Sequence, residues 1–430
     1  MRIFITGANG FIGSRVVGRL MADGHSILAA VRDPERFKRR FPGAEAIHAD
    51  LNHLTDPSHW IPLLSGADAV LNCAGALQSG RGQDLRAIHE RAPIALFDAS
   101  TRVGIRRIIQ VSAISANANA GTEYALTKLS AEHHLQRLPV DWVILRPSLV
   151  YGAGSYGGTS LMRALAALPF AMPTPGSGDQ VFQPIHVDDL ADAISRLFHD
   201  RRINRATIEP VGPERLTLRE ILIKLRRWLG LRPAGTVRMP MLFVRVAAGI
   251  GDWIGAGPLR TTSLKQMAYG NVGDVAAFIE ATGIEPRSMD AALSAQPATG
   301  QDLWHARLFF LRPLLRLALG LFFIWTGAAA LLFAQRADSE SLLLSIALPP
   351  SLVAAVLWGS AFVDIALGVW LLATRHPARV AGLMLALTSV YLIVLTIGIP
   401  ALWLDPLGAL AKVPIIMIAT MFLMATAEER

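Results

Sequence analysis

The sequence predicts a Rossmann-like, doubly wound parallel α/β domain followed by an all-α bundle of four transmembrane helices. In the amino-terminal part, short apolar runs alternate with helical patterns, which is typical of a mostly parallel sheet. Long apolar runs appear only beyond about residue 305, and they explain why 52% of the 430 residues are hydrophobic and only 17% are charged. We therefore expect an α/β domain at 1–295, whose substrate-side α+β region covers about 151–295, a linker at 296–306 and a bundle at 307–430.

A glycine-rich turn follows the first predicted strand, Arg2–Ile5, and precedes a helical pattern. A strand, such a turn and a helix in that order form the phosphate cradle of a dinucleotide-binding fold, in which the helix amino terminus offers N–H groups to the phosphates. A glycine turn of an unrelated α/β domain is the alternative, and the flanking strand and helix favour the cofactor site. The expected cofactor contacts are Gly7, Asn9, Gly10, Phe11, Ile12 and Gly13.

Five further runs complete the predicted sheet: Ser26–Val31, Ala44–His48, Ala69–Cys73, Ile108–Ser112 and Trp142–Leu145. The cofactor is expected at the carboxyl ends of these strands.

The end of the second strand distinguishes between the two nicotinamide cofactors. An acid there would bind the ribose hydroxyls of NAD, whereas an arginine can accommodate the 2′-phosphate of NADP. Arg32 occupies this position. We therefore expect NADP(H), with NAD(H) as the alternative if Asp33 binds the ribose and Arg32 is only solvated.

Tyr124 and Lys128 are the candidate catalytic pair, because a spacing of four places them on one face of a helix. The ammonium can lower the pKa of the phenol and hold the nicotinamide ribose, so that Tyr124 exchanges a proton with a carbonyl or alcohol. Ser112 can hydrogen-bond the reacting oxygen, and Ser115 is the alternative. An exposed helix pair is the other interpretation, which the preceding strand end disfavours.

Together these motifs resemble the short-chain dehydrogenase/reductase superfamily, in its extended and atypical branches. The resemblance implies that Asp50 and Leu51 contact the adenine and that Pro147 lies beside the nicotinamide. It also implies a strand end beside the cofactor at Cys73, Ala74 and Gly75. In the atypical branch the Tyr and Lys sometimes serve cofactor binding without turnover. Residues 1–295 further resemble the NADPH-binding accessory subunit of respiratory complex I and its bacterial relatives.

Two later segments of the α/β domain leave alternatives open. Asp188 is placed to cap a helix, and packing or capping is favoured over a catalytic role for His186. The pattern at 241–254 is apolar but contains Arg245 and Asp252. It predicts a helix that covers the cleft or lies against a bilayer, because it is too short and too polar to span one.

Four apolar segments near 314–334, 352–373, 380–399 and 407–425 predict the bundle, and the first three reach the length of about 20 residues that a span needs. The fourth contains Lys412 and Pro414. Basic residues flank one end of these segments: Arg307, Arg312, Arg316, Arg375 and Arg379. By the positive-inside rule we expect an inner-membrane protein with its soluble domain and both termini in the cytoplasm.

The net charge of +8 fits a protein facing anionic lipid, and we expect no nucleic-acid partner. Asp364 in the second span needs a partner, for which Lys412 is a candidate unless it reaches the interface. Residues 305–430 resemble the DoxX-like four-helix membrane family, and members of that wider family are linked to quinone-dependent electron transfer. The single cysteine excludes an intrachain disulfide and a multi-cysteine metal site, and no metal is expected.

These observations predict a membrane-anchored NADP(H)-dependent oxidoreductase that acts on a carbonyl, a quinone or another lipophilic acceptor. The first alternative is a non-catalytic NADPH-binding sensor or accessory protein that docks a membrane complex. The second is a sugar-nucleotide epimerase, which is disfavoured by Arg32 and by a cleft without clustered basic residues.

Overall fold

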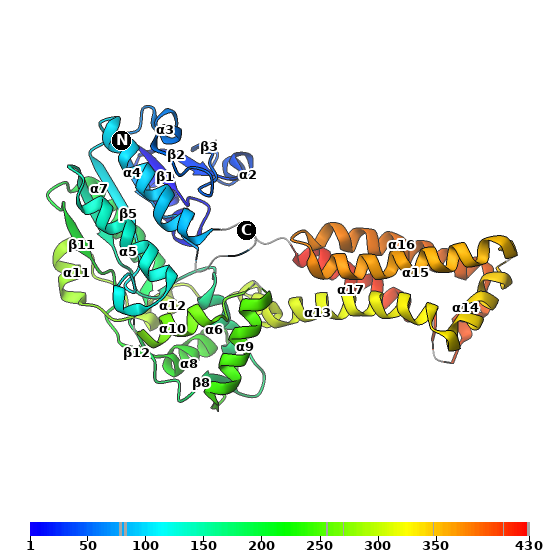
Figure 1. Cartoon of the computed structure of the whole chain (residues 1–430). Coiled ribbons are helices and arrows are strands. Elements are labelled where there is room, and N and C mark those ends of the chain that lie inside the picture. Colours follow the sequence, from blue (N-terminus) through cyan, green and yellow to red (C-terminus); the bar gives the residue numbers. More distant parts are fainter. Residues whose placement is uncertain are drawn as a thin grey trace. The chain divides into compact units, whose positions relative to one another are not determined.

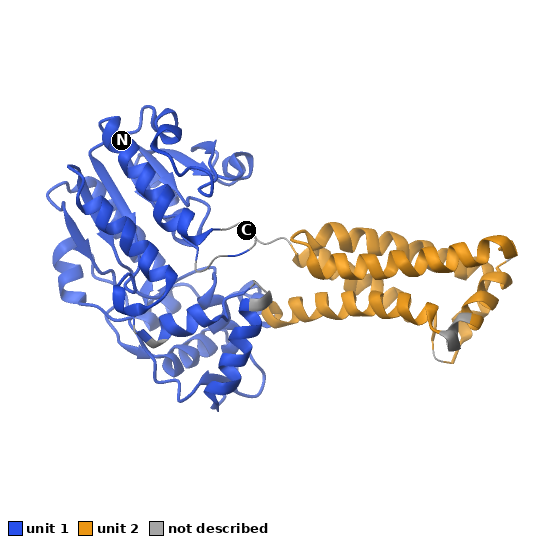
Figure 2. Cartoon of the chain, in the orientation of Figure 1, with its two compact units in different colours: residues 1–307 blue, residues 308–430 orange. Residues whose placement is uncertain are grey.

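The computed structural model describes the chain apart from residues 77–79, 81–83, 255–256, 270, 347, 407 and 428–430. It divides into two compact units, Met1–Arg307 and Leu308–Arg430 (Figure 2). The first unit contains a parallel sheet with helices, and the second is helical (Figure 1). The predicted fold class is therefore confirmed.

A seven-stranded parallel sheet forms the centre of the first unit, in the order β11-β6-β5-β4-β1-β2-β3. The strands are β1 (Arg2–Thr6), β2 (Ser26–Val31), β3 (Glu45–His48), β4 (Ala69–Asn72), β5 (Arg107–Val111), β6 (Asp141–Leu145) and β11 (Ala206–Ile208). Strand order reverses between β1 and β4, and at such a switch point a ligand crevice opens at the carboxyl ends. The six predicted strands are confirmed to within one residue; the sequence missed β11, which has only three residues.

Side chains of β1 alternate between two cores. Ile3 and Ile5 pack with residues of α1 (Phe11–Ala22) and α7 (Val187–His199) on one face of the sheet. Phe4 packs on the other face with residues of α4 (Ala92–Arg102) and α5 (Glu123–Gln136). Each large aliphatic or aromatic side chain buried in this way contributes about 1.5–3 kcal/mol. Helices on both faces hold the strand ends rigidly in place.

The substrate-side region has its own core, which joins small strand pairs and short helices. Its strands are β7 (Val150–Tyr151), β8 (Met172–Pro175), β9 (Val181–Phe182), β10 (Ile185–His186), β12 (Leu216–Thr217) and β13 (Thr236–Met239). Its helices are α6 (Gly158–Ala166), α8 (Leu218–Trp228), α9 (Met241–Ile254), α10 (Thr261–Tyr269) and α12 (Met289–Ala295). Helix α11 (Val275–Thr282) instead packs through Phe278 on the core of the seven-stranded sheet. The helical pattern predicted at 241–254 is thus confirmed as α9.

Apolar helices make up the second unit: α13 (Gly300–Leu331), α14 (Phe333–Ser345), α15 (Pro350–Ala373), α16 (Pro377–Gly398) and α17 (Val413–Thr426). By length and composition, three of them, α13, α15 and α16, can cross a membrane. The fourth segment is shorter than predicted, because residues 409–412 form turns and Pro414 lies in the first turn of α17. Residues 300–306, which were expected in a linker, form the first turns of α13.

Small residues bring the helices of the second unit into close contact. A Cβ added at Gly368 of α15 would lie 2.6 Å from the Gly320 carbonyl oxygen of α13. Such close approaches are typical of helix packing in membranes. At one end of α15, the Arg316 guanidinium donates hydrogen bonds to the Leu372 and Thr374 carbonyl oxygens, at 3.1 and 2.6 Å. These bonds satisfy carbonyl groups that a helix carboxyl terminus leaves unpaired.

Asp364 in α15 accepts a hydrogen bond from the Tyr391 hydroxyl of α16, at 3.5 Å. Lys412, the partner considered from the sequence, is exposed just before α17. The pairing with Lys412 is therefore wrong, since Tyr391 is closer in space although no sequence pattern singles it out.

Candidate functional site

The glycine-rich turn lies at the carboxyl end of β1, where backbone packs directly on backbone. Gly7 has a φ of +71°, and a Cβ there would lie 2.6 Å from the Ala74 nitrogen on the neighbouring strand end. A Cβ at Gly13 would clash with the Gly7 carbonyl oxygen. Gly10 donates to the same oxygen at 2.9 Å and stands directly before α1. Only glycine fits at Gly7 and Gly13, and the free amino terminus of α1 suits a pyrophosphate.

The other predicted contacts of the turn are Asn9, Phe11 and Ile12. All three are half-buried, and Ile12 packs against the core that contains Ile3. Helix α1 has no acidic residue in its first turn that would repel a phosphate. The residues present therefore fit a dinucleotide at this turn.

A row of hydrogen bonds ties the ends of three strands together. Thr6 donates to the Asn72 side-chain oxygen at 2.5 Å, and the Asn72 amide donates to Gln110 at 2.7 Å. The same Asn72 oxygen accepts from the Ala74 backbone N–H at 3.1 Å. This row fixes the predicted segment Cys73-Ala74-Gly75 at the switch point. Sequence reasoning missed Thr6 and Gln110, and the available signal was a polar residue in an otherwise apolar strand.

The structure brings Tyr124 and Lys128 together beside this strand end. The Lys128 ammonium is buried, lies 5.7 Å from the centre of the Tyr124 ring and donates to the Val111 carbonyl oxygen at 3.3 Å. A Cβ at Gly75 would lie 3.7 Å from the same ammonium. Tyr124 and Lys128 therefore lie beside the carboxyl ends of both β4 and β5.

Ser112 directly follows β5. Within the described part of the chain, its hydroxyl is buried and has no hydrogen-bond partner. A buried polar group of this kind calls for an explanation, and an incoming polar ligand atom is one. Ser115 is also buried, so both serines considered from the sequence lie in the interior.

Burial dominates the electrostatics of the catalytic pair. It lowers the pKa of Lys128 to about 8, partly offset by the carboxylate of Glu132. It raises the pKa of Tyr124 to about 12. The expectation that Lys128 lowers the phenol pKa is therefore wrong in this structure, because removal of the phenol from water disfavours its charged form. At neutral pH Tyr124 is protonated and suited to donate a proton.

His89 is a neighbour of the pair that sequence reasoning missed. It belongs to a π-helix (Ala87–Arg91), and its ring stands edge-on to the Tyr124 ring at 5.2 Å. Its Nε2 atom accepts from the Ala76 backbone N–H at 2.9 Å, so this nitrogen carries no proton. Burial and the Lys128 charge keep the pKa of His89 well below its usual value. His89 therefore stays neutral and holds both the chain after Gly75 and the Tyr124 ring.

The adenosine end of the expected site lies beyond β2 and β3. Arg32 is exposed at the end of β2, as is Arg36 in the first turn of α2 (Pro34–Arg40). Asp33, the alternative ribose ligand, caps α2 by accepting from the Arg36 backbone N–H at 2.9 Å. Asp50 accepts from the Asn52 backbone and side chain at 3.0 and 2.8 Å, which shapes the turn around Leu51.

Two remaining predicted residues lie on the nicotinamide side. Pro147 is buried, and its carbonyl oxygen accepts from the Ile114 backbone N–H at 3.1 Å. Burial raises the pKa of the Cys73 thiol to about 12, which makes this cysteine an unreactive wall residue.

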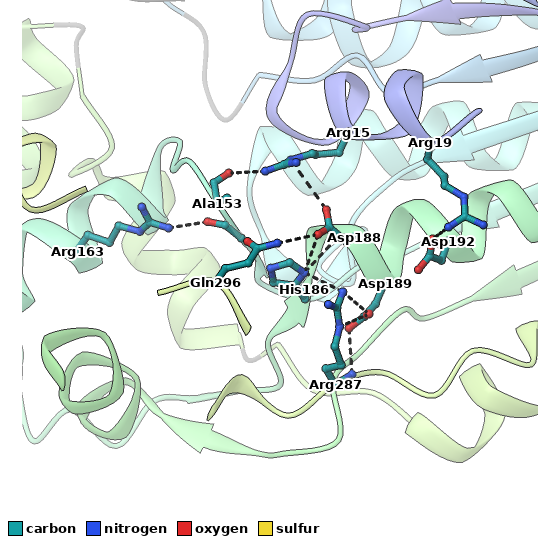
Figure 3. Close-up of polar contacts among 11 residues, drawn as sticks. Arg15, Arg19, Ala153, Arg163, His186, Asp188, Asp189, Asp192, Arg287 and Gln296 are labelled. Carbon is teal, nitrogen blue, oxygen red and sulfur yellow. Dashed lines mark hydrogen bonds and ion pairs between the residues drawn. The ribbon is translucent and has the colours of Figure 1, made fainter. Parts of the chain in front are cut away.

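A polar cluster surrounds the start of α7 (Figure 3). His186, not Asp188, caps this helix by accepting from the Asp188 backbone N–H at 3.3 Å. The predicted cap is wrong because the Asp188 carboxylate turns to Gln296, which donates to it at 3.2 Å. Buried Asp189 accepts two bonds from Arg287, at 2.8 and 3.0 Å. His186, Asp188, Asp189 and Arg287 are each engaged with a neighbouring group of the cluster, which indicates a structural role.

Two family models match the chain. Residues 7–200 match the NAD(P)H-binding family, and residues 320–421 match the DoxX-like family. The chain therefore combines an NAD(P)-binding, short-chain dehydrogenase/reductase-like Rossmann domain with a carboxyl-terminal DoxX-like domain. The DoxX-like domain and the three long apolar helices indicate membrane association.

Several curated proteins are similar to the first unit. A ceramide reductase of Caulobacter vibrioides is 25% identical over 58% of this chain and 77% of its own length. The mitochondrial 40 kDa subunit of NADH-ubiquinone oxidoreductase of Neurospora crassa is 23% identical over 57% of this chain and 64% of its own length. An uncharacterized protein of Mycobacterium tuberculosis is 27% identical over 53% of this chain, and the match spans only 23% of that protein.

Solved structures share the fold. UDP-glucuronic acid 4-epimerase from Bacillus cereus, in complex with UDP-glucuronic acid and NAD, superposes with a TM-score of 0.53 at 19% identity, covering 72% of this chain and 100% of its own. MoeE5 in complex with UDP-glucose and NAD gives 0.53 at 21% identity, covering 69% of this chain and 97% of its own. At these identities the likeness concerns the fold alone.

Proposed function

We propose that this protein is a membrane-anchored, NADPH-preferring reductase of a carbonyl or quinone group on a lipophilic molecule. The observation that carries the proposal is the meeting of Tyr124 and Lys128 at the switch point, beside the orphan hydroxyl of Ser112. Buried acid–base groups with shifted pKa values in a cofactor crevice are typical of catalytic sites.

The chain's own groups support reduction of a carbonyl to an alcohol. When bound, the reduced nicotinamide would supply the hydride that adds to the carbonyl carbon. Tyr124, protonated at neutral pH, would donate the proton that the carbonyl oxygen then takes up. The Ser112 hydroxyl would orient that oxygen, and the Lys128 ammonium would hold the nicotinamide ribose and stabilise the phenolate that Tyr124 leaves.

The preference for NADPH rests on charge at the end of β2. Arg32 and Arg36 present two exposed guanidinium groups, whereas Asp33 is already engaged as a helix cap. Guanidinium groups pair well with phosphate, and a capping carboxylate is less available for ribose hydroxyls.

A lipophilic substrate is supported by the membrane domain in the same chain and by the similarity to a ceramide reductase. The arginines at one end of the apolar helices favour an inner-membrane protein whose soluble unit and both termini face the cytoplasm, where NADPH is available. A carbonyl on a membrane lipid and a quinone are the two acceptor classes to test.

A second candidate is a non-catalytic NADPH-binding accessory protein that docks a membrane complex. It is favoured by the similarity to a 40 kDa subunit of NADH-ubiquinone oxidoreductase. It predicts tight NADPH binding without steady-state turnover.

The test is NADPH oxidation by the full-length protein in nanodiscs, with a long-chain ketone and with decylubiquinone as acceptors. A reductase oxidises NADPH with one of them, and Tyr124→Phe lowers this rate by about 10²–10⁴-fold. NADPH affinity of the same variant should stay within about twofold, because the hydroxyl acts on the substrate. Tight NADPH binding with no turnover on either acceptor would instead support the accessory protein.

A further inference from the structure

Helix α9 has one face packed on its own unit and one apolar face without cover among the described residues. Val244 and Ala248 are buried on the inner face. Leu242 and Phe243 are 69% and 63% exposed, and Val246 is 54% exposed. At 100° per residue these exposed positions, with Ile250, fall on a single stripe opposite the buried pair. A water-soluble surface rarely presents such a contiguous apolar stripe.

The strand that leads into α9 extends the same kind of surface. Val237 and Met239, two residues apart and therefore on one face of β13, are both exposed. The stretch from 230 to 254 holds three arginines, Arg232, Arg238 and Arg245, against one acid, Asp252, which accepts from the Thr261 hydroxyl at 2.6 Å. All three arginines are exposed. An exposed apolar stripe beside a net excess of cationic residues is the composition of a segment that lies in a membrane interface.

We propose that α9 is an interfacial helix, which rests its apolar stripe in the headgroup region of a bilayer that contains anionic lipid. The same chain carries three helices able to span a membrane, so this unit is tethered to a bilayer at high effective concentration. Each arginine near an anionic surface would add to the attraction. A second copy of the chain could also cover an apolar stripe, but this chain has a net charge of +8 and would gain nothing from the excess of arginines beside the stripe.

The position of α9 also bears on the substrate, and this step rests on the proposed function. Helix α10, which follows α9 in the chain, sends Gln266 to the Thr122 hydroxyl at 2.6 Å. Thr122 caps α5, whose second residue is Tyr124. Helix α9 is therefore followed by α10, and α10 contacts the start of α5, the helix that carries Tyr124 and Lys128. If the proposed function holds, a lipophilic substrate would approach Tyr124 from this side of the unit.

The test places a fluorescent label at α9 in the full-length protein. Phe243→Cys and Val246→Cys are each labelled with an environment-sensitive dye and reconstituted in phosphatidylcholine vesicles, with or without phosphatidylglycerol. Val103→Cys is the matched control, an exposed apolar residue that follows α4. The unsubstituted protein, labelled in parallel, gives the background from Cys73.

Lipids that carry a nitroxide near the headgroup should quench the α9 labels at least about twofold more than the control label, and more strongly with phosphatidylglycerol. Equal quenching at α9 and Val103 would overturn the proposal. Emission that depends on the protein-to-lipid ratio but not on the nitroxide would assign the stripe to a second copy, and would also overturn it. The readout needs no activity, so its failure is distinct from failure of the proposed function.

Discussion

Lys128 and Asp364 are both ionisable residues on helices in apolar surroundings, one in each compact unit. Lys128 donates to a backbone carbonyl at the end of β5, and Glu132 one turn further along α5 supports its charge. Asp364 accepts a hydrogen bond from the Tyr391 hydroxyl of the neighbouring helix, at 3.5 Å. The parallel sheet offers main-chain groups at its strand ends, whereas a transmembrane helix has already used its main chain internally.

This difference shows which unit can bring polar groups together in a functional site. In the first unit, backbone and side chains from β1, β4 and β5 meet at one edge, so a charged group is held beside a cofactor cradle. In the second unit the Asp364 carboxylate depends on a hydroxyl from a neighbouring helix. We therefore expect substitutions in the first unit to change binding and turnover, and those in the second to change stability modestly.

The largest expected effect is that of Lys128→Met, which keeps a long unbranched side chain and removes its charge. Turnover should fall by about 10²–10⁴-fold, because in the proposed function Lys128 would hold the ribose and support the Tyr124 proton transfer. Stability should not fall, since a buried charge is replaced by an apolar group. A thermal melt beside the NADPH oxidation assay checks both, and retention of full turnover would separate Lys128 from catalysis.

Arg32→Ala should weaken NADPH binding by about 1.5–3 kcal/mol, or roughly 10–100-fold, because it removes a charged partner of the 2′-phosphate. NADH affinity should change little. Fluorescence titration with both cofactors measures the contrast, and Arg39→Ala, at the far end of α2, is the control. An equal loss for NADH and NADPH would contradict the assignment of the 2′-phosphate to Arg32.

Gly7→Ala tests the main-chain contact that the first unit relies on. The added Cβ meets the Ala74 nitrogen at 2.6 Å with φ at +71°, so the unfolding free energy should fall by about 1–3 kcal/mol and NADPH binding should weaken. Gly18→Ala in the middle of α1 meets nothing within 4 Å and should instead stabilise by about 0.5–1 kcal/mol. A similar result for both variants would mean that the turn can relax.

NADPH affinity should fall as the pH rises through about 8, the pKa to which burial lowers Lys128. Affinity should fall rather than rise because Lys128 is positively charged below this pH and neutral above it. Its attraction to the bound cofactor is therefore lost on the alkaline side. The slope should approach about a tenfold loss of affinity per pH unit and be absent in Lys128→Met. Titrations between pH 6 and pH 9.5, roughly the range that brackets this pKa, measure it. The same slope in both proteins would assign the pH dependence to another group.

The smallest effect is expected in the second unit. Tyr391→Phe removes the hydroxyl that bonds to Asp364 and should lower stability by about 0.6 kcal/mol, and by no more than about 1.7 kcal/mol. Thermal unfolding in detergent measures this loss. Ser389→Ala is the control, because that hydroxyl bonds to Leu385 in its own helix. A loss of more than about 1.7 kcal/mol would mean that the Tyr391–Asp364 pair organises the whole bundle. It would contradict the expectation that substitutions in the second unit change stability only modestly.

Some features of this protein were determined by the sequence alone. The glycine spacing around Gly7, the alternation of apolar runs and the long apolar segments are local patterns, and they predicted the cradle, six strands and three membrane-spanning helices. The spacing of Tyr124 and Lys128 likewise placed both residues on one helix face. Local backbone preference and the period of hydrophobic residues are enough for such predictions.

Only the tertiary structure decided the features that depend on distant segments meeting. The neutral His89 beside Tyr124, the Thr6–Asn72–Gln110 row and the Tyr391 partner of Asp364 join residues far apart in the chain. The raised pKa of Tyr124 and the reversed capping roles of His186 and Asp188 depend on burial and on competing partners. These outcomes could not be predicted from the sequence, because desolvation and partner choice are set by packing rather than by spacing.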